Sequence, residues 1–259
     1  TLAVYLSDAL KYLFEYPYGC SEQLASKLSA IAITKKALAI PNTGGAVLPT
    51  VVFGKETYTV DQAVEKGLAQ IYDNQTVDGG FSYYKGLEAD PHLSIHVLNT
   101  LLDMRGAGYA VRADVVTNAV SYLYGKVTYF KTKAYSADTL VLLAYALSRA
   151  DGASASYSAL LKTVTNLATA RFLSDQASSN TLGYLALLAV RSSSGSLKER
   201  VFGALENRLD IDSRGAYIKQ NMANIGWAYY ETPEKDTALF LKALVADKRN
   251  HEVTDEMLR

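Results

Sequence analysis

The chain has 259 residues, 49% of them hydrophobic, and its 26 basic residues balance its 26 acidic residues. This length can bury one large core. The zero net charge and the lack of a basic stripe interleaved with aromatic residues argue against a nucleic-acid binder. No apolar run approaches a membrane span, and a single cysteine excludes an internal disulfide framework.

Apolar residues recur at helical spacing along nearly the whole chain, which predicts an all-α protein. The exception is 47–58, where apolar residues among prolines and glycines predict a short β-hairpin. The segments with helical spacing are 2–14, 20–39, 60–74, 91–105, 112–126, 135–150, 154–171, 179–193, 196–209 and 234–247.

Three of these helices begin alike, at 136–140, 178–182 and 234–238, with a polar capping residue ahead of an apolar run. The similarity indicates repeated helical hairpins, which must stack to bury their apolar faces. Stacking gives either an open solenoid or a closed toroid, and the periodicity alone does not choose between them.

The only cysteine, Cys20, lies three residues ahead of Gln23 at the start of the helix predicted over 20–39. Side chains three residues apart share one helix face. Attack of the Cys20 sulfur on the Gln23 carboxamide would expel ammonia and leave an internal thioester, and a helix N-terminus favours the thiolate. The alternative is that Cys20 is an inert, buried small side chain.

Asp78-Gly79-Gly80-Phe81 predicts a tight turn that needs glycine, followed by an aromatic side chain that plugs the core. A helix start follows at Asp90-Pro91-His92-Leu93.

The run Pro17-Tyr18-Gly19-Cys20-Ser21-Glu22-Gln23 resembles the thioester signature of the alpha-2-macroglobulin and complement family, most of all its bacterial members. Residues 78–81 and 90–93 resemble the loop and the next helix of that family. The resemblance implies an α/α toroid of six helical hairpins. Ten helices and an eleventh beginning near Glu252 leave the last helix missing, so we expect residues 1–259 to be a single thioester domain, a fragment of a larger multidomain protein.

The resemblance also implies a function, that of a protease inhibitor. The thioester between Cys20 and Gln23 would acylate lysine amines of an entrapped protease once, without turnover, so no enzyme is expected. The expected partners are target proteases and neighbouring domains of the same chain, with no cofactor, no nucleic acid and no membrane span in this segment. The expected location is extracytoplasmic, in a bacterial periplasm, anchored through parts outside this chain, or secreted.

Gly19, Glu22 and Tyr18 are expected to support the thioester, and Glu22 also complements the helix dipole. The loops before Cys20, at 78–81 and at 127–133 each connect an odd to an even helix, so we expect them to share one face. Aromatic residues on that face would exclude water. The candidates are Tyr16, Tyr18, Phe81, Tyr83, Tyr84, Tyr129 and Phe130.

In complement-type relatives a histidine on the loop between the fifth and sixth helices takes part in transfer, but 127–133 contains none. This difference favours direct attack by amines. His92 and His96, four residues apart on the expected face, are candidates for a base or nucleophile, with polar packing as the alternative. Further metal ligands are missing, so no metal site is predicted.

Two other classes of function remain open. An α/α-toroid enzyme of the terpene cyclase, prenyltransferase or glycosidase type would need an aspartate-rich run or a distinct carboxylate pair, and the sequence shows neither. A binding module with an inactive thioester would keep the fold without the chemistry, although both Cys20 and Gln23 are present. A Cys-His peptidase lacks a marked histidine and orienting group.

Overall fold

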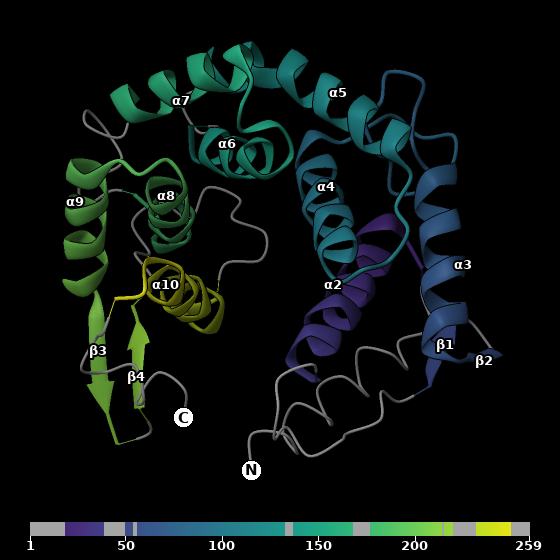
Figure 1. The fold of residues 1–259 in the computed structure, drawn as a ribbon, viewed down its shortest axis with the longest axis horizontal. Helices are drawn as coiled ribbons and strands as arrows, with labels where there is room; N and C mark the ends of the chain where they lie inside the picture. The colour runs from purple at the N-terminus through teal and green to yellow at the C-terminus, as the bar shows by residue number, and fades with distance from the viewer. Residues whose placement is uncertain are drawn as a thin grey trace. The chain divides into compact units, whose positions relative to one another are not determined.

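The computed structural model describes residues 19–38, 50–53, 56–132, 137–167, 177–213, 215–219 and 232–249. Most of these residues are helical, and two small antiparallel β-hairpins complete the secondary structure described (Figure 1). The contacts group the chain into two compact units, Thr1–Lys126 and Val127–Arg259. In the part of the chain described, no helix is long and apolar enough to cross a membrane.

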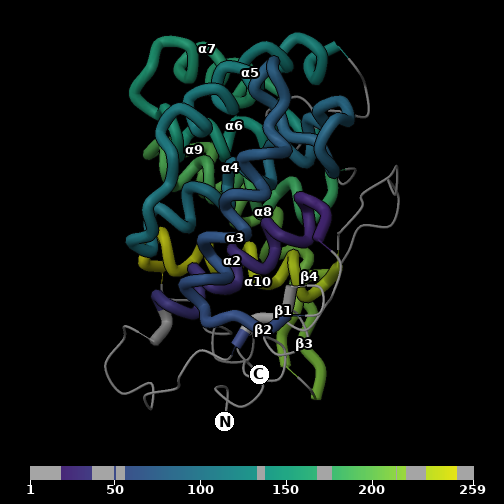
Figure 2. Tube along the Cα trace, turned by 90° about the vertical axis from the view of Figure 1, so that its right-hand side faces the viewer, coloured from purple at the N-terminus to yellow at the C-terminus, as the bar shows by residue number. Residues whose placement is uncertain are grey.

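The first unit is built around α2. Its elements are α2 (Ser21–Leu38), β1 (Val51–Phe53), β2 (Glu56–Tyr58), α3 (Val60–Asp73), α4 (Pro91–Gly106) and the larger part of α5 (Ala113–Thr132). Helix α2 packs against both α3 and α4, and the two views of Figures 1 and 2 show the three helices side by side. The start of α2 is therefore held by neighbours from two later segments of the chain.

Apolar and small residues explain this packing. Leu24, Leu28 and Ile31 of α2 have no exposed surface. A Cβ atom added at Gly67 of α3 would lie 3.3 Å from Leu28 Cδ2, so glycine lets the two helices approach closely. On the other side, Thr100 of α4 donates a hydrogen bond to the Ala25 carbonyl oxygen over 3.3 Å.

The second unit holds two helical hairpins and a further helix. Its elements after the end of α5 are α6 (Ala137–Asp151), α7 (Ala155–Leu167), α8 (Ser179–Arg191), α9 (Gly195–Glu206), β3 (Leu209–Asp212), β4 (Gly215–Ile218) and α10 (Pro233–Asp247). Helix α6 packs against α7, and α8 packs against α6, α9 and α10. Strands β3 and β4 are antiparallel, with Leu209 opposite Ile218.

The start predicted at 178–182 coincides with a helix cap, whereas the start predicted at 234–238 lies inside α10, whose cap is two residues before Glu234. Ser178 caps α8 by accepting a hydrogen bond from the Thr181 amide over 3.1 Å. Thr232 caps α10 by accepting one from the Lys235 amide over 3.2 Å. The third start, before α6, falls partly outside the described residues.

The predicted fold class, an all-α chain of helical hairpins with a short β-hairpin near 47–58, is confirmed. The expectation of a single domain stays a prediction. The helices expected at 2–14 and from Glu252 lie outside the described residues.

One local prediction is wrong, and one element was missed. Residues 127–133 were expected to form a loop, but α5 continues to Thr132. Gly125 and Lys126 resemble a helix end, yet Phe130 is fully buried and holds the last turns in place. The hairpin of β3 and β4 was not predicted, because its charged residues hide the strand alternation.

Candidate functional site

The candidate site is the start of α2, where Cys20 immediately precedes the first helical residue. The Cys20 carbonyl oxygen accepts the first helical hydrogen bond, from the Leu24 amide over 3.0 Å, so Cys20 is the N-cap residue. The Gln23 Oε1 atom accepts a hydrogen bond from the Cys20 amide over 3.2 Å. The carboxamide of Gln23 is thus folded back over the residue whose sulfur would attack it.

The site is shielded and anchored. Cys20 has only 9% of its surface exposed, and Gln23 is half-buried. The Gln70 side chain of α3 donates a hydrogen bond to the Gly19 carbonyl oxygen over 3.0 Å. This contact fixes the residue before Cys20 from a neighbouring helix.

Ser21 connects the site to the loop after α3. Its amide donates to the Tyr83 carbonyl oxygen over 3.0 Å, and its hydroxyl donates to the Ser82 carbonyl oxygen over 2.6 Å. The Asn74 amide nitrogen donates to the same hydroxyl over 2.8 Å, and Ser21 has no exposed surface. The loop that contains 78–81 therefore contacts the residue that follows Cys20, whereas the expected face shared by three loops stays a prediction. Neither Asn74 nor Gln70 was predicted, because both contacts join residues far apart in the sequence.

Neither glycine of 78–81 leaves room for a Cβ atom. Gly79 has a φ of 92°, and an added Cβ would lie 2.4 Å from the Asn118 carbonyl oxygen. At Gly80 an added Cβ would lie 2.6 Å from the Tyr122 ring. Phe81 is fully buried, and its amide donates to Ser94 Oγ over 2.8 Å. The turn and the aromatic plug are therefore architecture that positions the loop beside Ser21.

Tyr122 is the side chain that closes over this turn. Burial, helped by the Asp78 and Asp90 carboxylates, raises the pKa of Tyr122 to about 12. The phenol therefore stays protonated, and it donates a hydrogen bond to the Ala89 carbonyl oxygen over 3.4 Å.

The expected aromatic residues divide into different environments. Phe81 lies in the core, whereas Tyr83 and Tyr84 are 37% and 55% exposed on the loop bound to Ser21. Tyr16 and Tyr18 lie outside the described residues. Tyr129 and Phe130 lie on α5 in the second unit and not on a loop; Tyr129 is exposed and Phe130 is buried.

Glu22 and His96 are brought together through Ser26. The Ser26 hydroxyl donates to Glu22 Oε1 over 2.9 Å and lies 3.2 Å from His96 Nε2 on α4. His92, one turn earlier in α4, is exposed. The chain of contacts fastens α4 to the first turn of α2, and neither histidine has a described contact with Cys20.

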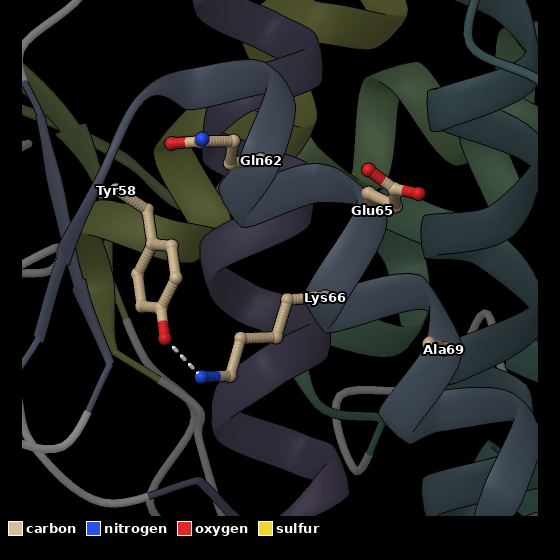
Figure 3. Close-up of a pocket in the computed structure, with 5 residues that line it drawn as sticks. All are labelled: Tyr58, Gln62, Glu65, Lys66 and Ala69. Carbon is tan, nitrogen blue, oxygen red and sulfur yellow. Dashed lines mark hydrogen bonds between the residues drawn. The ribbon is translucent and has the colours of Figure 1, made fainter.

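Two pockets lie on α3 and not at the start of α2. One, of about 300 Å³, is lined by Tyr58, Gln62, Glu65, Lys66 and Ala69 (Figure 3). There the Lys66 amine donates to the Tyr58 hydroxyl, which donates to Glu56. The other, of about 590 Å³, lies between α3 and residues 109–112. Neither pocket includes Cys20, Gln23 or a histidine.

Sequence comparisons find relatives among bacterial proteins, although no family model matches. An alpha-2-macroglobulin of Thermotoga maritima is 27% identical over 118 residues, which are 46% of this chain and 7% of that protein. An alpha-2-macroglobulin of Xylella fastidiosa is 32% identical over 118 residues, 45% of this chain and 7% of that protein. The match therefore spans a small part of each relative's length.

Solved structures show the same fold. Native alpha-2-macroglobulin of Escherichia coli, from domain MG7 to the C-terminus, superposes with a TM-score of 0.67 at 20% identity, covering 98% of this chain and 37% of that one. Salmonella alpha-2-macroglobulin reacted with methylamine gives a TM-score of 0.69 at 19% identity, covering 98% of this chain and 15% of that one. Over these 118 residues the chain is therefore similar in sequence to bacterial alpha-2-macroglobulins, and its fold is similar to theirs.

Proposed function

We propose that Cys20 and Gln23 form an internal thioester, and that the chain transfers the Gln23 acyl group to an amine. The single observation that carries this proposal is the 3.2 Å hydrogen bond that folds the Gln23 carboxamide back onto the Cys20 amide. The burial of Cys20 supports it, because a thioester open to water would hydrolyse.

The geometry suits formation of the bond. The Cys20 thiol gives up its proton and its sulfur attacks the Gln23 amide carbon. Negative charge then develops on Gln23 Oε1, the atom that already accepts from the Cys20 amide, so a donor is in place where the charge appears. The nitrogen of Gln23 takes a proton and leaves as ammonia, and the carbon–sulfur bond remains.

Release of the stored acyl group follows the same path in reverse order. An amine attacks the thioester carbon, the carbon–sulfur bond breaks, and the Cys20 thiolate takes up the proton that the amine loses. Gln23 then carries a new amide and cannot react again. Each chain acts once, so the chemistry is acyl transfer without turnover.

Lysine amines of proteases are the proposed targets. Structures of relatives describe Escherichia coli alpha-2-macroglobulin activated by trypsin and by porcine elastase, and the Salmonella protein reacted with methylamine. These descriptions support proteases as partners and small amines as probes. The proposal also places the chain in a larger, extracytoplasmic protein. Neighbouring domains of that protein would press on the exposed tyrosines beside Cys20 and shield the thioester from water.

The test is the intact mass of the chain before and after methylamine, with free thiol titrated in parallel. In the freshly prepared chain we expect a mass short by one ammonia and a blocked thiol, and we expect methylamine to release the thiol and to add its own mass. Cys20→Ala removes the deficit and the reaction, and in the protein that contains this chain it removes covalent conjugates to trypsin. A full sequence mass with a free thiol from the outset would contradict the proposal.

Shielding has its own test. Methylamine should react faster with the isolated chain than with the protein that contains its neighbouring domains. Equal rates would remove the neighbouring domains from the proposal and leave the acyl transfer standing.

A further inference from the structure

Lys27 lies on the same face of α2 as the two thioester residues. It follows Cys20 by seven residues and Gln23 by four. At 3.6 residues per turn its direction from the helix axis differs by about 20° from that of Cys20 and by about 40° from that of Gln23. The three side chains therefore form one row along the first two turns.

Lys27 is an unusual residue in this row, because only 1% of its surface is exposed. Burial lowers the pKa of its amine below the ordinary lysine value. A lowered pKa increases the fraction of neutral amine, which is the nucleophilic form.

The direction of helical side chains brings the amine toward the acyl group. Side chains in an α-helix lean toward its N-terminus, so the Lys27 stem starts in the direction of Gln23. The Gln23 carboxamide is itself folded back onto the Cys20 amide. The Cβ atoms of residues four apart are about 5–6 Å from each other, a gap that a four-carbon lysine stem can span.

A second lysine in the same register gives an internal contrast. Lys66 follows Gln62 by four residues at the start of α3, as Lys27 follows Gln23. Hydrogen bonding to Tyr58 raises the pKa of Lys66 (Figure 3), and its side chain is 44% exposed. Burial of Lys27 is thus a property of its site and does not follow from the spacing.

We propose that Lys27 is an internal acyl acceptor that captures the Gln23 acyl group when no target amine reaches it. The neutral Lys27 amine attacks the thioester carbon, the bond to sulfur breaks, and the Cys20 thiolate takes the proton that the nitrogen loses. The products are a Gln23–Lys27 isopeptide bond within α2 and a free Cys20 thiol. The inference rests on the proposed thioester, which supplies the acyl group.

The internal amine competes with water for an unspent bond. A group held beside the reacting carbon acts at a high effective concentration, whereas the burial of Cys20 and Lys27 limits water. A target amine that arrives first ends the competition. Formation of the Gln23–Lys27 isopeptide bond would consume the thioester without producing the Gln23 carboxylate that hydrolysis leaves, and the chain could not react again.

Mass, thiol content and trypsin cleavage distinguish the products. The chain carrying the bond is incubated without added amine. Capture by Lys27 frees the Cys20 thiol while the mass stays short by one ammonia. Trypsin, which needs an unmodified lysine side chain, then fails to cut after Lys27, and the uncut peptide carries the deficit. Hydrolysis frees the same thiol but adds one water.

Lys27→Arg keeps the positive charge and removes the acylable amine, so we expect complete loss of the uncut, ammonia-deficient peptide. Lys27→Met, an unbranched side chain without an amine, is used if arginine does not fit. Because trypsin does not cut after methionine, its readout is the intact mass, and we expect its thiol to be freed only with gain of one water. Lys36→Arg, at an exposed lysine of the same helix, is the matched control and should behave as the unaltered chain. Circular dichroism checks the fold of each variant.

The remaining outcomes separate the two proposals. In the first outcome, the mass is short by one ammonia and the thiol is blocked at the outset. The thiol is then freed only with gain of one water, and at equal rates in the unaltered chain and in Lys27→Met. The acceptor role is then overturned and the thioester stands. If the mass is complete and the thiol is free from the beginning, both proposals are overturned.

Discussion

The starts of α2 and α3 share one arrangement but differ in chemistry. Cys20-Ser21-Glu22-Gln23 and Thr59-Val60-Asp61-Gln62 both place an acidic residue and then a glutamine in the first turn. In each, the glutamine Oε1 accepts from the amide of the residue that caps the helix, over 3.2 Å at Gln23 and 3.1 Å at Gln62. This bond is half of a capping box. Helix capping therefore suffices to bring the carboxamide back to the N-cap residue.

The capping side chain and its burial make the difference. Thr59 completes its capping box by accepting from the Gln62 amide over 3.4 Å, and both residues are exposed. Cys20 offers a thiol in the same place, has 9% exposure, and is flanked by the buried Ser21. The same capping hydrogen bond thus positions the glutamine in both helices, and the shielded thiol is what distinguishes α2 as the site of the proposed reaction.

The largest effect is expected from Cys20→Thr, which gives α2 the same cap as α3. The ammonia deficit and the reaction with methylamine should disappear completely. Stability to urea should be kept or rise by up to about 1 kcal/mol, because threonine is a better N-cap than cysteine. An intact mass still short by one ammonia would place the modification elsewhere in the chain.

The reciprocal change tests whether geometry alone is sufficient. Thr59→Cys, made in the Cys20→Thr chain, creates a cysteine three residues ahead of Gln62 at an exposed helix start. We expect a free thiol and no ammonia deficit, because water reaches this exposed site and hydrolyses any bond that forms, which leaves glutamate at position 62. Capture by Lys66 is not expected, because hydrogen bonding to Tyr58 raises the pKa of its amine. A stable ammonia deficit would show that burial is not needed.

The loop that holds Ser21 provides the next largest effect. Gly79→Ala should lower the free energy of unfolding by about 2 kcal/mol or more, because a positive φ is strained for alanine and its Cβ would meet the Asn118 backbone. Gly86→Ala is the matched control, with a φ of 88° and nothing within 4 Å of an added Cβ. It should cost about 1 kcal/mol. Urea unfolding of both variants measures the difference, and equal losses would refute the steric argument.

The local part of this site could be predicted from the sequence. The apolar period places a helix start next to Cys20, and the distance of three residues to Gln23 fixes a shared face, because both depend only on neighbouring residues. The turn at Gly79 could also be predicted, since few residues other than glycine adopt its conformation.

The contacts between distant segments could not be predicted. Gln70 and Asn74 look like ordinary polar residues near the end of a helix, and only the packing of α3 on α2 brings them to Gly19 and Ser21. Lys27 reads as a solvated helix residue until its burial is known. The extension of α5 was missed for the same reason, because Phe130 stabilises it through tertiary burial.

A smaller effect is expected from Asn74→Ala, which removes the hydrogen bond to the Ser21 hydroxyl. Loss of a buried bond of this kind costs about 1–3 kcal/mol. The methylamine reaction should also speed up, because the loop at Tyr83 is held less firmly against the start of α2. Gln62→Ala, which breaks the corresponding cap at exposed α3, should cost about 1 kcal/mol and leave the methylamine rate unchanged. A rate that moves equally in both variants would point to a global loosening.

The first turn of α10 also contains a buried reactive group, the carboxylate of Asp236, and so it tests whether burial changes the chemistry of a side chain near a helix start elsewhere in the chain. Asp236 has no exposed surface, and its Oδ1 accepts from the Asn180 side chain over 3.2 Å. Burial raises the pKa of Asp236 in the folded chain, although Asn180, Lys235 and Arg208 oppose the shift. Since the folded pKa lies above the unfolded one, ionisation destabilises the fold as pH rises, and the cost is absent below the unfolded value of about 4.

Asp236→Asn removes that ionisation while keeping an oxygen for Asn180. The stability of the variant relative to the unaltered chain should therefore increase as pH rises from about 4 through the folded pKa and then level off. Urea unfolding at a series of pH values measures this difference, and a difference that does not change with pH would show that Asp236 titrates alike in both states. Such a result would mean that burial leaves this first-turn carboxylate unchanged, and the effect of burial proposed for Cys20 and Lys27 would then be confined to α2.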